Sequence, residues 1–162
     1  MLREFEVQNT SACDVNDDEH IDESTFLRTG NRDDEYFLVE FNSRPRLVEG
    51  FTENIDSLEE LVLSTRPKGS TALFDALHFA LEKLTDAHRS KKALLLISDG
   101  QDNVSRYRFT DITGYIKEQD AQIYAIGTFV PPMVDMMHHS PVDTLRGLTE
   151  TTGGQGFFTA IN

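Results

Sequence analysis

Two short stretches of this sequence combine residue types that can bind a hard metal ion. In the first, Asp99 directly follows the apolar run Ala93–Ile97 and precedes Gly100. Five consecutive apolar residues without alternation are typical of a strand buried on both faces of a parallel sheet. Ligands of open α/β sheets bind beyond the carboxyl ends of such strands, so we expect Asp99 to lie at a binding site. The alternative is that Asp99 and Gly100 simply form a turn.

The second stretch is Gly69-Ser70-Thr71, which precedes a pattern typical of an amphipathic helix. We therefore expect Thr71 at the amino end of a helix that packs on the sheet. Its hydroxyl can bind a cation, or it can cap the helix by accepting a backbone N–H. The apolar side of this predicted helix comprises Leu73, Leu77, Leu81 and Leu84.

Gly-Ser-Thr before a helix and Ser-Asp-Gly after a buried strand together resemble the von Willebrand factor type A (VWA) domain family. The resemblance runs from about Phe26 to Asn162, and the segments 26–31 and 34–39 resemble its bacterial branch. In that family, three segments hold a divalent cation at the top of the sheet. They are an Asp-x-Ser-x-Ser loop after the first strand, a Thr before a later helix, and an Asp that ends a central strand. Thr71 and Asp99 match the second and third segments.

The first of these segments is absent, and residues 1–25 form an acidic segment with six carboxylates between Asp14 and Glu23. Asp14, Asn16 and Asp18 place side-chain oxygens at alternate positions, the spacing by which a loop directs several ligands toward one hard cation. They stand where the family carries its first ligand segment. The alternative is a solvated acidic linker, or the remnant of a damaged first strand and helix.

The other elements predict a doubly wound α/β fold, as the resemblance also implies. Its sheet is mostly parallel, with one antiparallel edge strand, helices on both faces, and an abnormal or truncated first strand and helix. Residues 1–25 are expected to precede a VWA-like domain at 26–162. We predict a hairpin of strands 35–42 and 46–51, further strands at 121–127 and 156–160, and helices that begin at Asn54 or Asp56, at Thr110 and at Val142.

Composition argues against several classes of function. Fifteen basic and 28 acidic residues give a net charge of −13, which disfavours binding to nucleic acids and to anionic membranes. A single cysteine, Cys13, cannot form an internal disulfide. No run resembles a signal peptide or a membrane span, so we expect a soluble chain. The sequence does not indicate its compartment. Adjacent His138 and His139 cannot easily face one ion, and the Gly-x-Ser-x-Gly motif of serine hydrolases is missing.

The resemblance implies a non-enzymatic adhesion or assembly module that binds another protein. Mg²⁺, or alternatively Mn²⁺ or Ca²⁺, would be held by Thr71 and Asp99 and would keep an open position for an acidic side chain of the partner. The alternatives are a scaffold that binds partners without metal and a magnesium-dependent hydrolase, which would need a second carboxylate and a positioned base. The expected rim of the site comprises Gly69, Ser70, Ser98 and the loop that begins at Gln101.

Overall fold

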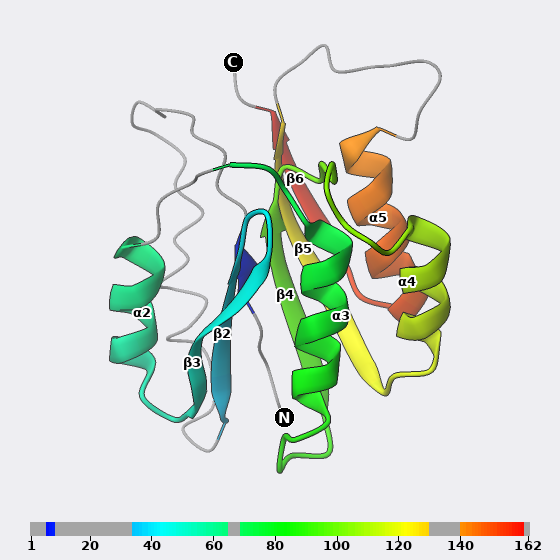
Figure 1. The fold of residues 1–162 in the computed structure, drawn as a ribbon. Helices are drawn as coiled ribbons and strands as arrows, with labels where there is room; N and C mark the ends of the chain where they lie inside the picture. Colours follow the sequence, from blue (N-terminus) through cyan, green and yellow to red (C-terminus); the bar gives the residue numbers. More distant parts are fainter. Residues whose placement is uncertain (1–5, 9–33, 65–68, 130–139, 161–162) are drawn as a thin grey trace.

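The computed structural model describes residues 6–8, 34–64, 69–129 and 140–160. They form a six-stranded sheet with the order β3-β2-β1-β4-β5-β6 (Figure 1). The predicted α/β fold, with its mostly parallel sheet and one antiparallel edge strand, is confirmed. The parallel strands are β1 (Glu6–Gln8), β2 (Tyr36–Phe41), β4 (Lys92–Ser98), β5 (Ala121–Phe129) and β6 (Gly156–Ala160), and β3 (Pro45–Thr52) is antiparallel to β2.

The first strand lies in the middle of the sheet. Val7 of β1 pairs with Val39 of β2 on one side and with Leu96 of β4 on the other. Glu6–Gln8 are the residues of this strand that the structure describes. The abnormal first helix that the sequence also suggested falls within residues 9–33, outside the described residues.

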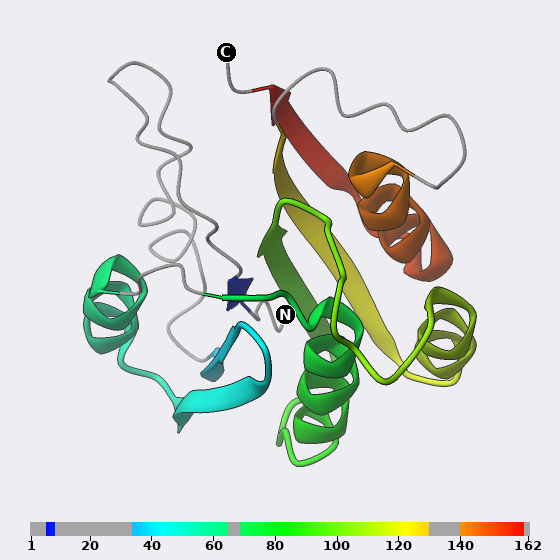
Figure 2. The ribbon, with the colours of Figure 1, turned by 45° about the horizontal axis from the view of Figure 1, so that its top comes forward.

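Helices cover both faces of the sheet, as predicted (Figure 2). On one face, α3, α4 and α5 enclose the main core together with alternate residues of β2, β4 and β5. On the other face, α2 packs through Leu58 and Val62 against Tyr36 and Leu38 of β2. The helices are α2 (Ile55–Ser64), α3 (Leu73–Leu84), α4 (Phe109–Lys117) and α5 (Pro141–Thr152).

The apolar run of β4 is buried on both faces, as its lack of alternation predicted. Leu94 and Leu96 are fully buried in the core beneath α3, while Leu95 and Ile97 on the opposite face are each 8% exposed. Removing this much apolar surface from water stabilises each side chain by about 1.5–3 kcal/mol. The strand therefore fixes the position of Asp99, which directly follows it.

Two predicted helix starts differ in outcome. Asn54 caps α2, because its Oδ1 accepts a hydrogen bond from the backbone N of Ser57 at 3.2 Å. The prediction that Thr110 caps the next helix is wrong, since α4 begins at Phe109 and Thr110 lies inside it. There, Asp111 reaches back and its Oδ2 accepts from the backbone N of Arg108 at 3.0 Å. An acidic residue in the first turn thus accepts from the N–H of the residue before the helix, a contact different from the one expected of a Thr110 cap.

Candidate functional site

The carboxyl ends of the parallel strands lie together at one edge of the sheet, which we call the upper edge because it is uppermost in Figure 1. The segment 69–72 crosses this edge on its way into α3 (Figure 2). The backbone N of Ala72 donates to the carbonyl of Asn42, in the β2–β3 turn, at 2.7 Å. Gly69 has a φ of 85°, a conformation that L side chains rarely adopt. This segment is therefore held against the hairpin before it reaches Thr71.

On its other side, Thr71 is bound to the loop that follows β4. The backbone N of Thr71 donates to Oδ1 of Asn103 at 2.8 Å, and the backbone N of Asn103 donates to the carbonyl of Thr71 at 3.0 Å. The loop follows directly on β4 and carries both Asp99 and Asn103. The reciprocal hydrogen bonds therefore hold Thr71 and the Asp99 loop at the same edge of the sheet. Thr71 itself is buried, with 5% of its surface exposed.

Asp99 and Ser98 form a tight turn at the end of β4. Oδ1 of Asp99 accepts from the backbone N of Gln101 at 3.0 Å, and Oγ of Ser98 accepts from the backbone N of Gly100 at 3.0 Å. Ser98 is 2% exposed. Its hydroxyl therefore supports the turn and is not presented on the rim where the sequence analysis placed it. Gly69 is exposed, and Ser70 and Gln101 are partly exposed, so these residues can line a rim.

The amino end of α3 is capped by a distant loop. The residue before the helix is Ala72, which offers no side-chain acceptor, so the prediction that Thr71 could serve as the cap is wrong. Oγ of Ser105 accepts instead from the backbone N of Phe74 and of Asp75, each at 3.1 Å. The Ser105 hydroxyl in turn donates to Asp102. Sequence reasoning missed this cap because it comes from about 30 residues away along the chain.

Asp75 binds the same loop at the next residues, Arg106 and Tyr107. Its Oδ1 accepts from the backbone N of Arg106 at 3.0 Å and of Tyr107 at 3.4 Å, while its Oδ2 accepts from Nε of Arg106 at 3.0 Å. Asp75 is 8% exposed, so this carboxylate is buried but well satisfied. The hydrogen bond that Arg106 donates to Asp75 raises the pKa of the Arg106 guanidinium, which therefore stays charged.

The comparison with protein families decides the identity of this fold. The profile of the von Willebrand factor type A domain matches residues 20–161. The chain belongs to this family. Domains of this family typically mediate interactions between proteins, and many bind a divalent metal. No curated protein matches this sequence.

Solved structures of other VWA proteins share the fold at low sequence identity. BatB from Bacteroides thetaiotaomicron is 13% identical, with a TM-score of 0.66 over 86% of this chain and 77% of its own. A von Willebrand factor type A protein from Catenulispora acidiphila is 16% identical, with a TM-score of 0.64 over 86% of this chain and 32% of its own. Proximal thread matrix protein 1 from the mussel byssus, with zinc in its MIDAS motif, is 17% identical, with a TM-score of 0.64 over 83% and 34%.

The donor types at the upper edge of this VWA domain suit a hard cation, but few are described. Hydroxyl and carboxylate oxygens, as in Thr71 and Asp99, are what Mg²⁺ and Ca²⁺ prefer. Within residues 6–8, 34–64, 69–129 and 140–160, no group of three or more His, Cys, Asp or Glu is arranged to hold a metal. The predicted substitute ligands Asp14, Asn16 and Asp18 lie outside these ranges.

The position of β1 in the chain reveals a further signal in the sequence. β1 ends at Gln8, so the residues that directly follow the first strand are Asn9-Thr10-Ser11-Ala12-Cys13. This run has the spacing of Asp-x-Ser-x-Ser, with Asn in place of Asp and Cys in place of the last Ser. An amide oxygen and a hydroxyl remain suitable for a hard cation, whereas a thiol does not.

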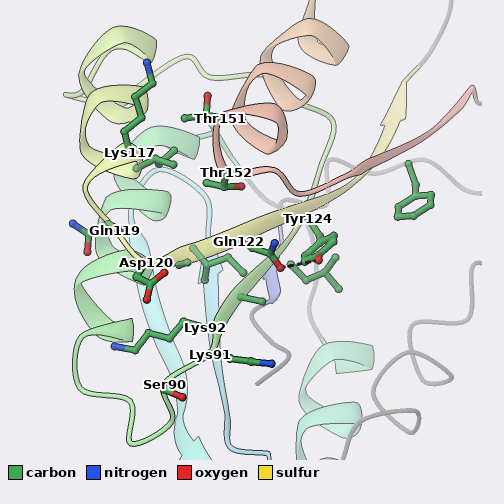
Figure 3. Close-up of a pocket in the computed structure, with 16 residues that line it drawn as sticks. Ser90, Lys91, Lys92, Lys117, Gln119, Asp120, Gln122, Tyr124, Thr151 and Thr152 are labelled. Carbon is green, nitrogen blue, oxygen red and sulfur yellow. Dashed lines mark hydrogen bonds between the residues drawn. The ribbon is translucent and has the colours of Figure 1, made fainter. Parts of the chain in front are cut away.

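A pocket of about 870 Å³ lies far from these residues, at the lower edge where the parallel strands begin (Figure 3). Lys91, Lys92 and Lys117 are among its lining residues. Figure 3 shows that Lys91 and Lys92 point to opposite sides of the strand and that Lys117 points away from both. Because these three ammonium groups do not converge, no small anion can contact all of them.

In the part of the chain that the structure describes, no helix is long and apolar enough to cross a membrane.

Proposed function

We propose that this VWA domain is a non-enzymatic interaction module that binds an acidic side chain of a partner protein through a divalent cation at the upper edge. The cation is Mg²⁺, or Mn²⁺ or Ca²⁺ in its place. The observation that carries the proposal is the pair of hydrogen bonds between Thr71 and Asn103, at 2.8 and 3.0 Å, which hold a hydroxyl and the Asp99 loop together. Thr71 would bind the ion through its hydroxyl, and Asp99 directly or through water.

A cation held in this way is suited to a carboxylate of the partner. Mg²⁺ prefers six oxygen ligands, and a site with few protein carboxylates leaves the ion with residual positive charge and an open position. The chain as a whole carries a net charge of −13, so an acidic partner needs a local positive charge in order to approach it. Gly69, Ser70 and Gln101 would form the rim around that carboxylate.

Calorimetric titration with Mg²⁺ and Mn²⁺ tests the proposal on wild type and on Asp99→Ala. We expect Asp99→Ala to abolish the heat of binding and the metal-dependent rise in melting temperature, because a ligand that binds only the folded state stabilises it by mass action. Without metal, the variant should lose only about 1 kcal/mol of stability, because it lacks the hydrogen bond from the backbone N of Gln101 to Oδ1 of Asp99. Asp120→Ala, at the lower edge, is the control and should leave the metal response unchanged. A loss of stability without any change in metal binding would assign Asp99 to the turn alone.

The same titration on two multiple variants locates the missing first ligand segment. Replacing Asn9 and Ser11 with Ala tests the run that directly follows β1. Replacing Asp14, Asn16 and Asp18 with Ala tests the acidic segment. The variant that removes the metal response identifies the segment that supplies the ligands, and an unchanged response in both would exclude both segments.

A metal-free scaffold is the second candidate, and one observation favours it. Oδ1 of Asp99 already accepts a hydrogen bond from Gln101, and Asp75 and Ser105 already fasten the rim loop to α3. Protein groups therefore already connect the segments of the upper edge. This candidate predicts partner binding that EDTA leaves unchanged. The hydrolase alternative has no comparable support in the described residues, where no further cluster of carboxylates and histidines accompanies Asp99. Turnover of p-nitrophenyl phosphate in the presence of Mg²⁺ would be needed to establish it.

A further inference from the structure

Arg106 carries an exposed guanidinium whose Nε is held in place by Asp75. Its side chain is 81% exposed, although Nε is fixed by Oδ2 of Asp75 at 3.0 Å. Its Cζ lies 5.8 Å from the centroid of the Tyr107 ring. Within the described part of the chain, the terminal nitrogens of this guanidinium have no hydrogen-bond partner. Anchoring reduces the conformational entropy that a new hydrogen bond to these nitrogens would cost.

Arg106 stands next to a rigid aromatic surface. The His78 ring stacks between Tyr107, at a centroid distance of 4.4 Å and an interplanar angle of 7°, and Tyr115, at 4.6 Å and 17°. All three rings are partly exposed. Tyr and Arg are enriched among the residues that dominate binding energy at protein interfaces, because they bring a large contact area with few rotatable bonds or a planar set of donors. We call Arg106, Tyr107, His78 and Tyr115 the α3 shoulder.

The α3 shoulder adjoins the proposed cation site. Asp75, which holds Arg106, lies in the first turn of α3, four residues after Thr71. Four residues span at most about 14 Å even when fully extended. An extended peptide advances about 3.3 Å per residue, so the cation site and the guanidinium would be bridged by a few residues. Both positive groups lie on a domain whose net charge is −13. They would therefore act together as the attractive region for an acidic partner.

We propose that Arg106 binds a second carboxylate of the acidic partner segment, two to four residues along the chain from the carboxylate at the cation. This inference rests on the proposed function, because the same segment occupies both positions. A guanidinium accepts a carboxylate through two parallel N–H donors, which fixes its direction as well as its charge. The Tyr107 ring, whose centroid lies 5.8 Å from Cζ of Arg106, would supply an apolar contact beside the second carboxylate.

Fluorescence anisotropy with labelled peptides tests this inference. The probes are fluorescein-labelled Gly/Ser nonapeptides with one Glu, or with two Glu separated by one to five residues. Each is titrated with the wild-type chain in Mg²⁺ and in EDTA. We expect the two-Glu peptides of the proposed spacing to bind at least tenfold more tightly than the one-Glu peptide in Mg²⁺. Arg106→Gln should remove this difference, and Arg106→Lys should restore only part of it because an ammonium lacks the planar pair of donors.

Arg146→Gln is the matched control. Arg146 is also an exposed guanidinium, 52% exposed, whose Nη1 lies 3.5 Å from Oδ1 of Asp143 and whose Cζ lies 5.7 Å from the Phe158 ring centroid. It lies on α5 and not on the α3 shoulder, so its removal should leave peptide binding unchanged. The fold should survive Arg106→Gln, because the backbone N of residue 106 still donates to Asp75; melting temperatures of both variants check this.

The outcomes separate this inference from the proposed function. Mg²⁺-dependent binding that Arg106→Gln leaves unchanged would overturn the inference and leave the proposed function standing. A spacing preference that depends on Arg106 but survives EDTA would support the role of Arg106 and overturn the role of the cation. If no two-Glu peptide binds more tightly than the one-Glu peptide, the inference is overturned, and calorimetry alone then decides the role of the cation.

Discussion

The two edges of the sheet differ in how their polar residues are used. At the upper edge, Asn103 binds the backbone of Thr71, Ser105 caps α3, and Asp75 holds the loop at Arg106. At the lower edge, the pocket of about 870 Å³ is bordered by lysines that point apart (Figure 3). The pocket at the lower edge therefore does not bring charged groups toward one point, whereas polar groups at the upper edge join separate segments. The difference teaches that polar contacts between segments, and not volume, mark the candidate site of this domain.

The largest difference in stability between the two edges is expected at two glycines with similar backbone conformations. Gly100 at the upper edge has a φ of 77°, and Gly153, after α5 and near the lower edge, has a φ of 71°. A Cβ at Gly100 would lie 2.3 Å from the carbonyl oxygen of Pro141, whereas a Cβ at Gly153 would meet no atom within 4 Å. We expect Gly153→Ala to cost about 1 kcal/mol and Gly100→Ala about 3 kcal/mol or more. Urea denaturation measures both, and equal losses would contradict the tight packing of the upper edge.

Two serines test the same difference between the edges, with a smaller expected effect on the free energy of unfolding. Ser105 accepts from two backbone N–H groups at the start of α3, whereas Ser90 is exposed beside the lower pocket. We expect Ser105→Ala to lower the free energy of unfolding by about 1–2 kcal/mol, the usual cost of losing a helix cap. Ser90→Ala should change it by less than about 0.5 kcal/mol. Denaturant melts of the two variants side by side measure the difference, which should vanish if solvent caps α3 equally well.

The smallest expected effect concerns a contact near the lower edge, between Glu35 and His88. The Glu35 carboxylate accepts from the backbone N of His88 at 2.6 Å and lies 3.0 Å from its Nδ1. Burial alone would raise the pKa of Glu35, but the hydrogen bonds from His88 outweigh it and place this pKa below its ordinary value of 4.5. The contribution to stability is therefore present above that value and is lost as the pH falls through the lowered pKa.

Glu35→Gln should accordingly flatten the acid side of the stability curve. We expect the melting temperature of the variant to fall less than that of wild type between about pH 5 and pH 3, because it has no carboxylate at position 35 to protonate. Thermal melts across this range measure the effect. Glu53→Gln, at an exposed position before α2, provides the control and should follow wild type. Parallel curves for wild type and Glu35→Gln would show that the contact with His88 does not contribute.

Much of the fold could be predicted because its signals are local. The unbroken apolar run of β4 indicates burial on both faces, and the leucines of α3 mark the face that packs on it. β1 was harder to predict, since Glu6-Val7-Gln8 is too short for a periodic pattern and two of its three residues are polar. Its place is determined by pairing with β2 and β4, which no local signal contains.

The candidate site could be predicted only in part, for a related reason. Asp99 and Thr71 stand beside recognisable elements, so their common edge follows from the topology of a parallel sheet. The contacts that hold this edge together, from Asn103 and Ser105, join segments about 30 residues apart. A hydroxyl in a loop gives no indication of which backbone amides it will accept from. One hint was available, because a helix that begins after Ala72 needs an acceptor from elsewhere.

The central position of β1 also determines how load passes through the molecule. β1 pairs in parallel with β2 on one side and with β4 on the other, so it connects the β2–β3 hairpin to β4, β5 and β6. The main core on one face of the sheet includes α3 together with Phe37 and Val39 of β2 and Leu94 and Leu96 of β4. A pull on a partner bound at the upper edge would therefore reach both parts of the sheet through β1 and through the core around α3.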